Sequence, residues 1–186
     1  KKGQRFVTSM GLGSMGWCVP SAIACCVASG KRRTLVLEGD GSLQHNLQEL
    51  QLISTYKLPI KLFVLSNEGY ASIYTMQRNN FKSNFAGCNR ESGLMLPDMK
   101  DIADTYHLRY FCIENNAQID SVLEECMADD VPCLCEVISS IHFDEIPKSV
   151  TTANADGTFS SSKLENLYPF VDEREQKENM PDWGDL

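Results

Sequence analysis

The chain has 186 residues, with 17 Lys or Arg against 25 Asp or Glu, so its formal net charge is −8. This length suits one large domain with its own core. The acidic balance, without a basic stripe, argues against nucleic-acid binding, and no apolar run is long enough to cross a membrane.

The first predicted elements surround a run of glycines. Residues 6–9 are predicted to form a short strand, followed by Gly11-x-Gly13-x-x-Gly16 and a helix of small residues. This spacing matches the dinucleotide-binding fingerprint, and Glu38, at the end of the next strand, is placed to bind a ribose. A NAD-dependent dehydrogenase is therefore one hypothesis for the chain.

Two apolar runs, residues 34–38 and 60–65, are predicted to be parallel strands joined by a helix over residues 46–56. The first run ends at the turn GDG and the second at the turn SNEG. In a right-handed βαβ unit both ends lie at the carboxyl edge of the sheet, where open α/β proteins bind ligands. We therefore expect the two turns to meet in space.

These two turns carry oxygen ligands. Asp40 supplies a carboxylate and Asn67 an amide oxygen. Mg²⁺ prefers such hard donors and commonly shares its coordination shell with a phosphate. Gly39 and Gly41 allow a ligand to approach the backbone, and amides at the start of a helix attract anions. The pattern predicts a diphosphate bridged by a metal ion to the ends of two strands.

The alternation of helices and strands continues downstream. We expect a helix over residues 70–78, a helix over 99–107 capped by Asp98, and a strand over 109–113. A further helix, capped by Asn116, turns Ile119, Val122, Leu123 and Cys126 inward, before a strand over residues 133–138. The predicted fold class is α/β, a doubly wound, mostly parallel sheet with helices on both faces, over residues 1–142.

From residue 143 the composition becomes polar and irregular. Residues 143–186 are predicted to be a tail without regular structure that packs on the domain or on a partner. The apolar residues expected to make that contact are Leu164, Leu167, Tyr168, Pro169 and Phe170. The chain begins at Lys1 without Met, and we expect it to be part of a longer protein.

The eight cysteines are predicted to be reduced thiols. Cys25 and Cys26 lie within a predicted helix, and Cys133 and Cys135 lie on a predicted strand, which are core positions. The sequence has no C-x-x-C pair and only three histidines, so a zinc site is not expected. Reduced thiols and the lack of a signal peptide predict a cytoplasmic location.

Three stretches resemble the thiamine-diphosphate (ThDP) enzymes, and within them the acetolactate synthase group. They are GLGSMGWCVPSAIA, GDGS followed by HNLQEL, and LPIKLFVLSNEGYASI. The family motif is Gly-Asp-Gly, a spacer, and usually Asn-Asn; here Ser66 stands in place of the first Asn, and Asn67 remains. The tail segment DGTFSSSKLENLYPFVDEREQKEN also resembles the ends of acetolactate synthase-like proteins from sugar and polysaccharide gene clusters.

The resemblance implies a set of site residues. Asp40, Asn67 and the Gly69 carbonyl would hold Mg²⁺, and donors at Gly41, Ser42 and Tyr70 would hold the diphosphate. The Gly13 carbonyl would accept the aminopyrimidine amine, and Met15 would lie under the cofactor and bend it, although plain core packing is an alternative for Met15. The complete cofactor-binding set is Gly13, Ser14, Met15, Gly39, Asp40, Gly41, Ser42, Asn67, Gly69, Tyr70 and Ala71.

The resemblance also implies an activity. Enzymes of this family attack a 2-oxo acid with the thiazolium carbanion of ThDP, expel CO₂ and pass the acyl group to an acceptor. Their activating glutamate lies on a separate pyrimidine-binding domain, in an earlier part of the chain or on another subunit. The expected assembly is a homodimer or homotetramer, and this chain, with no catalytic residue of its own, should be inert alone.

Further hypotheses remain open from the sequence. The chain could belong to a simple 2-oxo acid decarboxylase rather than a carboligase, or to a non-enzymatic module that binds a diphosphate for assembly. If this chain contacts the substrate, the expected contacts are Tyr70, Ile73, Gln77 and Phe81. These residues lie along the predicted helix and in the polar, aromatic stretch that follows it.

Overall fold

The computed structural model describes residues 2–9, 11–142 and 146–180. It divides into two compact units, Lys1–His142 and Phe143–Leu186. Within the described residues, no helix combines the length and apolar character needed to cross a bilayer.

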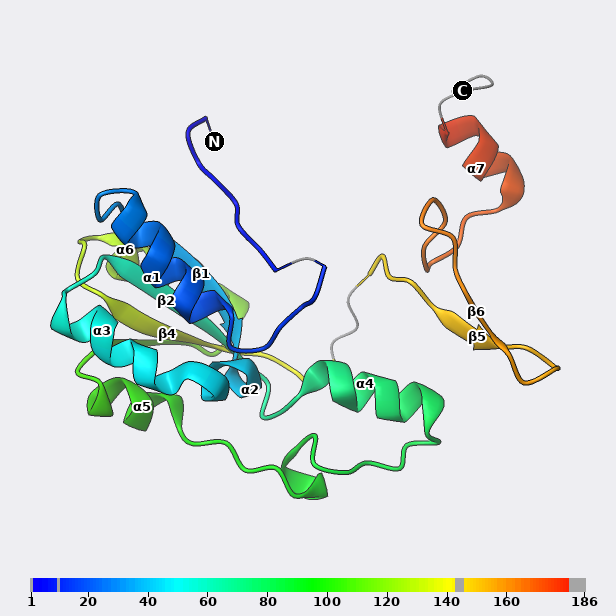
Figure 1. Cartoon of the computed structure of the whole chain (residues 1–186), viewed down its shortest axis with the longest axis horizontal. Coiled ribbons are helices and arrows are strands. Elements are labelled where there is room, and N and C mark those ends of the chain that lie inside the picture. The colour runs from blue at the N-terminus through cyan, green and yellow to red at the C-terminus, as the bar shows by residue number, and fades with distance from the viewer. Residues whose placement is uncertain (1, 10, 143–145, 181–186) are drawn as a thin grey trace. The chain divides into compact units, whose positions relative to one another are not determined.

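The first unit is built on a four-stranded sheet (Figure 1). Its strands are β1 (Thr34–Gly39), β2 (Ile60–Ser66), β3 (Arg109–Ile113) and β4 (Cys133–Ile138). They lie in the order β1-β2-β4-β3, and each neighbouring pair is parallel. The predicted α/β class with a parallel sheet is confirmed.

Helices cover both faces of this sheet. One buried cluster joins α1 (Cys18–Ala28), α3 (Leu50–Thr55) and α5 (Met99–Thr105) to one face, and a second joins α6 (Ile119–Met127) to the other. Right-handed crossovers explain this division. The chain moves across the sheet in one direction from β1 to β2 to β3, then reverses to reach β4, so α6 lies on the opposite face from α3 and α5.

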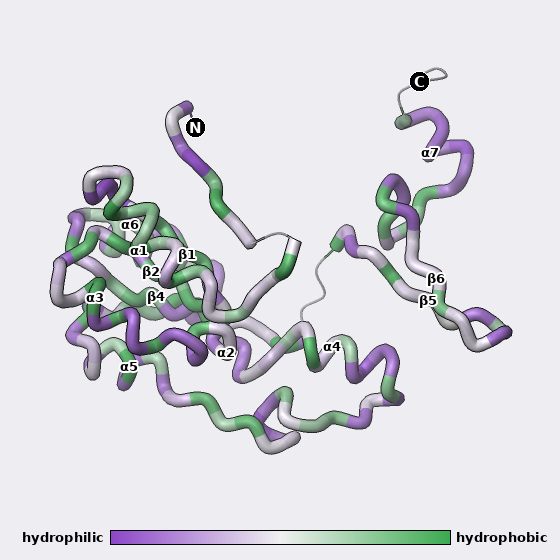
Figure 2. Tube along the Cα trace, in the orientation of Figure 1, coloured by the Kyte–Doolittle hydropathy of each residue, from purple (hydrophilic) through white to green (hydrophobic). Residues whose placement is uncertain are grey.

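The alternation of side chains along β2 fills both clusters. Ile60, Leu62 and Val64 belong to the first cluster, whereas Phe63 belongs to the second, as expected for successive residues of a strand. Because β2 lies inside the sheet and is covered on both faces, it is a continuous apolar run except for Lys61. Figure 2 shows hydrophobic residues along β2 and β4 and along α1, whereas the segment between α2 and α3 is hydrophilic.

The edge strand β1 is covered on one face only. Val36 is buried in the first cluster, but its neighbours Leu35 and Leu37 are exposed, Leu37 by 67%. Parallel sheets normally have both faces covered. Leu35 and Leu37 thus form an apolar strip that no described residue buries.

Short helices connect these elements. They are α2 (Asp40–Leu43), α4 (Ala71–Asn80) and the 3₁₀ helices η1 (Gln44–Glu49), η2 (Arg90–Ser92) and η3 (Asn116–Gln118). As predicted, the Asp98 carboxylate caps α5 by accepting hydrogen bonds from the amides of Lys100 and Asp101.

Two local predictions are wrong. Residues 6–9 are not a strand; Phe6 is 87% exposed, and among the described residues the segment lacks the paired strand that a ladder requires. The side chain of Asn115, not Asn116, caps the turn before α6, and Ile119, expected to face inward, is partly exposed. The helix expected over residues 46–56 is found as the end of η1 followed by α3, and only Asn46, at its start, has a non-helical backbone.

The second unit has more regular structure than the predicted irregular tail. Strands β5 (Thr151–Ala153) and β6 (Phe159–Ser161) pair as an antiparallel hairpin. The helix α7 (Glu173–Asn179) follows, capped by the Asp172 carboxylate, which accepts a hydrogen bond from the Glu175 amide. The packing of this unit on the first unit or on a partner stays a prediction.

Candidate functional site

The turns after β1 and β2 are joined by one carboxylate. Asp40 Oδ2 accepts hydrogen bonds from the backbone amides of Asn67 at 2.9 Å and Glu68 at 2.7 Å. Its other oxygen, Oδ1, accepts from the amide of Gly41 at 2.7 Å. The two turns therefore meet at the carboxyl edge of the sheet, as the βαβ pattern predicts.

Asp40 is almost completely buried at this junction. Burial raises the pKa of the carboxyl above its ordinary value, and the hydrogen bonds from the surrounding amides oppose that rise. A cation bound next to this buried carboxyl group would stabilise its ionised form.

Asn67, whose backbone amide donates to Asp40, also has a buried side-chain acceptor. Among the described residues, no group donates a hydrogen bond to its side-chain oxygen, Oδ1. A buried acceptor left unpaired costs free energy, which a bound cation would offset. The Gly69 carbonyl is also near, because a methyl group on Gly41 would lie 3.3 Å from that oxygen. A carboxylate, an amide oxygen and a carbonyl form a donor set that fits Mg²⁺.

Gly41 is required by the close approach of its neighbours. A Cβ atom there would lie 2.5 Å from two ring carbons of Tyr70, whereas a Cβ on Gly39 meets nothing nearer than Ser42 Cβ at 4.0 Å. We expect Gly41→Ala to push the Tyr70 ring and the Gly69 carbonyl away, at about 1–3 kcal/mol of overpacking.

The matched pair of variants gives a sharp test. In the full-length protein, Gly41→Ala should weaken ThDP binding by about tenfold or more, because about 1.4 kcal/mol corresponds to a factor of ten. Gly11→Ala, whose added Cβ would meet no atom within 4 Å and which is not among the proposed cofactor contacts, should bind nearly as the wild type. Isothermal titration calorimetry checks both, and equal affinities of the two variants would contradict the close packing of Gly41.

The loop of residues 11–16 docks on the segment after the GDG turn. The Gly16 amide donates to Ser42 Oγ at 2.9 Å, and Asn46 Nδ2 donates to the Gly16 carbonyl at 2.6 Å. Asn46 has a non-helical backbone, with φ −144° and ψ 37°. This hydrogen bond holds Asn46 outside helical geometry, so the helix expected over residues 46–56 begins after it.

The predicted residues of this first loop lie at the surface. Ser14 and Met15 line a hollow together with Trp17 and Asn46. Met15 is 40% exposed, so it is not a core residue, and the core-packing alternative is wrong. Gly13 takes a left-handed φ of 57°, which favours glycine at that position.

The donors expected for a diphosphate are partly in use. The Tyr70 amide donates to the Cys88 carbonyl at 2.8 Å, and the Gly41 amide is bound by Asp40. The hydroxyl groups of Ser42 and Tyr70 are different, since a hydroxyl that accepts one hydrogen bond can still donate another. Ala71 begins α4, so its amide is one of the first-turn donors that have no acceptor within the helix.

The carboxylate of Glu38 does not suit the dehydrogenase hypothesis. Glu38 is buried on the face covered by α1, near Cys18, and raises the pKa of that thiol, after burial itself, to about 11. A ribose-binding acid must be open to its ligand at the end of the strand. Sequence spacing placed Glu38 correctly along the chain but could not show which way it faces.

The residues proposed for substrate contact have mixed surroundings. Gln77 is bound to the loop after α4, since its side chain donates a hydrogen bond to the Ala86 carbonyl and accepts one from the Ala86 amide. Phe81 is exposed at the end of α4. The sequence did not reveal that Tyr74 of α4 stacks on Phe85 and lies 3.4 Å, hydroxyl to Nδ1, from His142.

Comparison with known proteins gives a consistent result. Residues 1–137 match the family described as thiamine pyrophosphate enzyme, C-terminal TPP binding domain. The chain is 30% identical over 138 residues to an acetolactate synthase large subunit of Porphyra purpurea, covering 73% of this chain and 23% of that protein. It is 46% identical over 68 residues to a probable pyruvate decarboxylase of Schizosaccharomyces pombe, covering 37% of this chain and 12% of that protein.

A solved structure is also similar. A ThDP-dependent 4-hydroxybenzoylformate decarboxylase of Rhodococcus jostii RHA1 superimposes with a TM-score of 0.60 at 25% identity, over 71% of this chain and 24% of that one. The chain thus spans about a quarter or less of each of these relatives.

Proposed function

Because this chain belongs to the thiamine pyrophosphate enzymes, as a C-terminal TPP-binding domain, we propose that it binds the diphosphate of ThDP through Mg²⁺ held by Asp40, Asn67 and Gly69. In this proposal it is part of an acetolactate synthase-like enzyme that acts on 2-oxo acids. The family membership also removes the reason for the dehydrogenase hypothesis.

The observations that carry the proposal are the unpaired buried oxygen of Asn67 and the buried Asp40 carboxylate, which accepts a hydrogen bond from the Asn67 backbone amide. Both groups lie on turns that one carboxylate ties together, so their spacing is held by the fold. Of the cations common in proteins, Mg²⁺ suits this all-oxygen set and accepts diphosphate oxygens as its remaining ligands.

The residues around this metal site would position the cofactor. The hydroxyls of Ser42 and Tyr70 and the amide of Ala71 would donate to the diphosphate, with Gly39 in the same turn. Gly13, Ser14 and Met15, on the loop that Ser42 and Asn46 anchor, would contact the rings. Bound ThDP supplies the carbon nucleophile that attacks a 2-oxo acid, while the protein supplies position and electrostatics.

The proposal includes a partner. We expect a pyrimidine-binding domain, from the same polypeptide or from another subunit of a homodimer or homotetramer, to complete the site and provide the activating glutamate. The exposed apolar strip of Leu35 and Leu37 supports burial by a further polypeptide element. The eight free thiols support a cytoplasmic location.

A simple 2-oxo acid decarboxylase is the second candidate. Its support is the resemblance to proteins named as decarboxylases, including the 46% identity to the Schizosaccharomyces pombe protein across 68 residues. Carboligation and decarboxylation share the release of CO₂ and differ in whether an acceptor takes the acyl group. Product analysis of the full-length protein therefore distinguishes them.

The test compares the full-length protein with the 186-residue chain. With pyruvate, ThDP and Mg²⁺, the full-length protein should release CO₂ and form either acetolactate or acetaldehyde, and chelation of the metal should stop the reaction. The chain alone should be inactive. Turnover by the chain alone would contradict the need for a partner, and binding of NADH without ThDP binding would contradict the cofactor assignment.

A further inference from the structure

Two buried cysteines face each other at the end of the sheet opposite the cofactor edge. Cys126 lies in the last turn of α6 and Cys133 is the first residue of β4. Both side chains are fully buried, and their sulfur atoms are 3.1 Å apart. The site proposed for ThDP uses neither residue.

The strand register places cations on both sides of Cys133. It pairs with Lys61 on β2 and with Arg109 on β3, and paired residues of parallel strands point to the same face. Lys61 is completely buried. Positive charge beside a pair of hydrogen-bonded thiols stabilises a thiolate within the pair.

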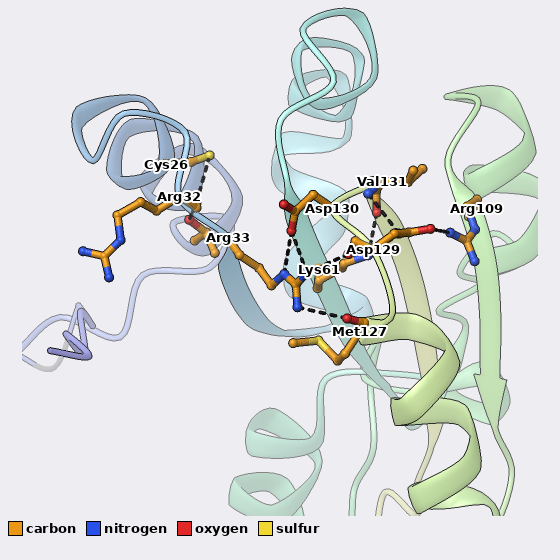
Figure 3. Close-up of polar contacts among 10 residues, drawn as sticks. Cys26, Arg32, Arg33, Lys61, Arg109, Met127, Asp129, Asp130 and Val131 are labelled. Carbon is orange, nitrogen blue, oxygen red and sulfur yellow. Dashed lines mark hydrogen bonds and ion pairs between the residues drawn. The ribbon is translucent and has the colours of Figure 1, made fainter. Parts of the chain in front are cut away.

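Lys61, Arg109 and Arg33 all contact the loop between the two cysteines (Figure 3). Lys61 Nζ donates to the Val131 carbonyl at 2.6 Å and lies 3.3 Å from an Asp129 oxygen. Arg109 pairs with Asp129 at 2.6 Å, and Arg33 pairs with Asp130 at 2.7 Å. Three cations thus meet two carboxylates, which leaves one excess positive charge beside the sulfur pair.

We propose that Cys126 and Cys133 form a reversible intramolecular disulfide when the protein meets a small peroxide oxidant. The two sulfur atoms need to approach by about 1 Å to reach bonding distance. The bond would join the end of α6 to the start of β4 across a short surface loop.

The cationic surroundings indicate which sulfur reacts first. The pKa of Cys126 is lowered to about 7, chiefly by the hydrogen bond with Cys133 and also by Lys61 and Arg109, against the opposing effects of burial and Asp129. The pKa of Cys133 is raised, first by the same hydrogen bond and then by burial. Cys126 is therefore the thiolate and Cys133 the resolving thiol.

The chemistry balances with hydrogen peroxide as the oxidant. The Cys126 thiolate attacks one peroxide oxygen, an S–O bond forms, the O–O bond breaks, and the departing hydroxide takes a proton to become water. The Cys133 sulfur then attacks the sulfenic acid, the S–S bond forms, and the S–O bond breaks with release of a second water. The protein loses two electrons and two hydrogens, and the peroxide is reduced.

Burial sets the rate but does not prevent the reaction. The covering loop, residues 127–132, is short and its Asp129 side chain is 43% exposed, so local opening of this loop admits a molecule nearly as small as water. Cys135, two residues further along β4, is buried on the same face. Burial, first, and its acidic neighbours raise its pKa to about 12, so it is a matched, unreactive control.

The experiment treats the purified full-length protein with hydrogen peroxide, alkylates the remaining thiols, and digests it with a protease that cleaves before aspartate. Cleavage at Asp129 or Asp130 separates the two cysteines, so their peptides stay joined only by a disulfide. We expect a joined Cys126–Cys133 peptide pair, a mass lower by two hydrogens, and full reversal by dithiothreitol.

Variants sharpen the test. Cys133→Ser, which keeps a hydrogen-bond donor beside Cys126, should abolish the joined pair and leave a Cys126 sulfenic acid that dimedone traps, whereas Cys135→Ala should form the joined pair as the wild type does. If Cys133→Ser fails to fold, fragmentation of the joined wild-type peptides still tells Cys133 from Cys135, which lie on the same peptide. Recovery of alkylated Cys126 and Cys133 after peroxide treatment, or a disulfide between any other pair, would overturn the proposal.

Discussion

Asp40→Ala is expected to weaken the binding of ThDP to the full-length protein by at least about 100-fold at saturating Mg²⁺. Loss of a residue that merely supports a metal ligand costs up to about 100-fold in metal affinity, so loss of a charged ligand should cost no less. Without the Asp40 carboxylate, the metal would keep only uncharged protein ligands, among them the unpaired Asn67 oxygen, beside the charged diphosphate. Isothermal titration calorimetry with and without Mg²⁺ measures the change.

Two further variants separate metal binding from folding. Asp40 also accepts three backbone hydrogen bonds, so its removal loosens both turns. Asp40→Asn keeps the size of the side chain, and its thermal unfolding temperature reports any loss of the fold. Asp104→Ala removes an equal charge from an exposed pair with Lys100 and should leave ThDP binding unchanged. Wild-type affinity in a folded Asp40→Ala protein would contradict the assignment.

Among the substitutions considered, those in the ion pair of Lys61 and Asp129 should have the largest effect on stability. Replacing Asp129 should cost more free energy of unfolding than replacing Lys61. Asp129→Ala leaves a fully buried ammonium with the Val131 carbonyl as its neighbour. Removing the partner of a buried ammonium is destabilising, because it leaves an uncompensated buried charge. Lys61→Met instead fills the same volume and leaves Asp129 partly exposed and paired with Arg109, so it should cost less than about 1.5 kcal/mol.

Urea unfolding checks this ranking. Asp129→Ala should lower the free energy of unfolding more than Lys61→Met, and the double variant should be more stable than Asp129→Ala. Asp130→Ala, which removes a carboxylate from an exposed pair with Arg33, is the matched control and should change little. An Asp129→Ala protein as stable as Asp130→Ala would show that the burial of Lys61 does not depend on Asp129.

The sequence was sufficient to predict the meeting of Asp40 and Asn67. Two apolar runs with a helix between them allow few arrangements, since a right-handed βαβ unit places both strand ends at one edge. The alternation of strands and helices along the sequence likewise predicted that helices cover both faces of the sheet. The residue types at the turns also predict a metal-bridged diphosphate there, which stays a prediction.

Features that depend on distant contacts were not predictable in this way. The helix break at Asn46 depends on a hydrogen bond to Gly16, thirty residues earlier. The burial of Lys61 depends on a loop that lies 68 to 70 residues later. Hydrophobic periodicity records which face of an element is buried, but not which residue of another element approaches it. The pairing of Cys126 with Cys133 was missed for the same reason.

The most direct test is a crystal structure of the full-length protein with ThDP and Mn²⁺ in place of Mg²⁺, because the anomalous scattering of Mn²⁺ locates the metal independently. We predict one anomalous peak within about 2.0–2.3 Å of the Asp40 carboxylate, the Asn67 side-chain oxygen and the Gly69 carbonyl, with diphosphate oxygens completing the octahedron. A peak coordinated by other residues, or ThDP bound with its diphosphate away from these two turns, would contradict the account.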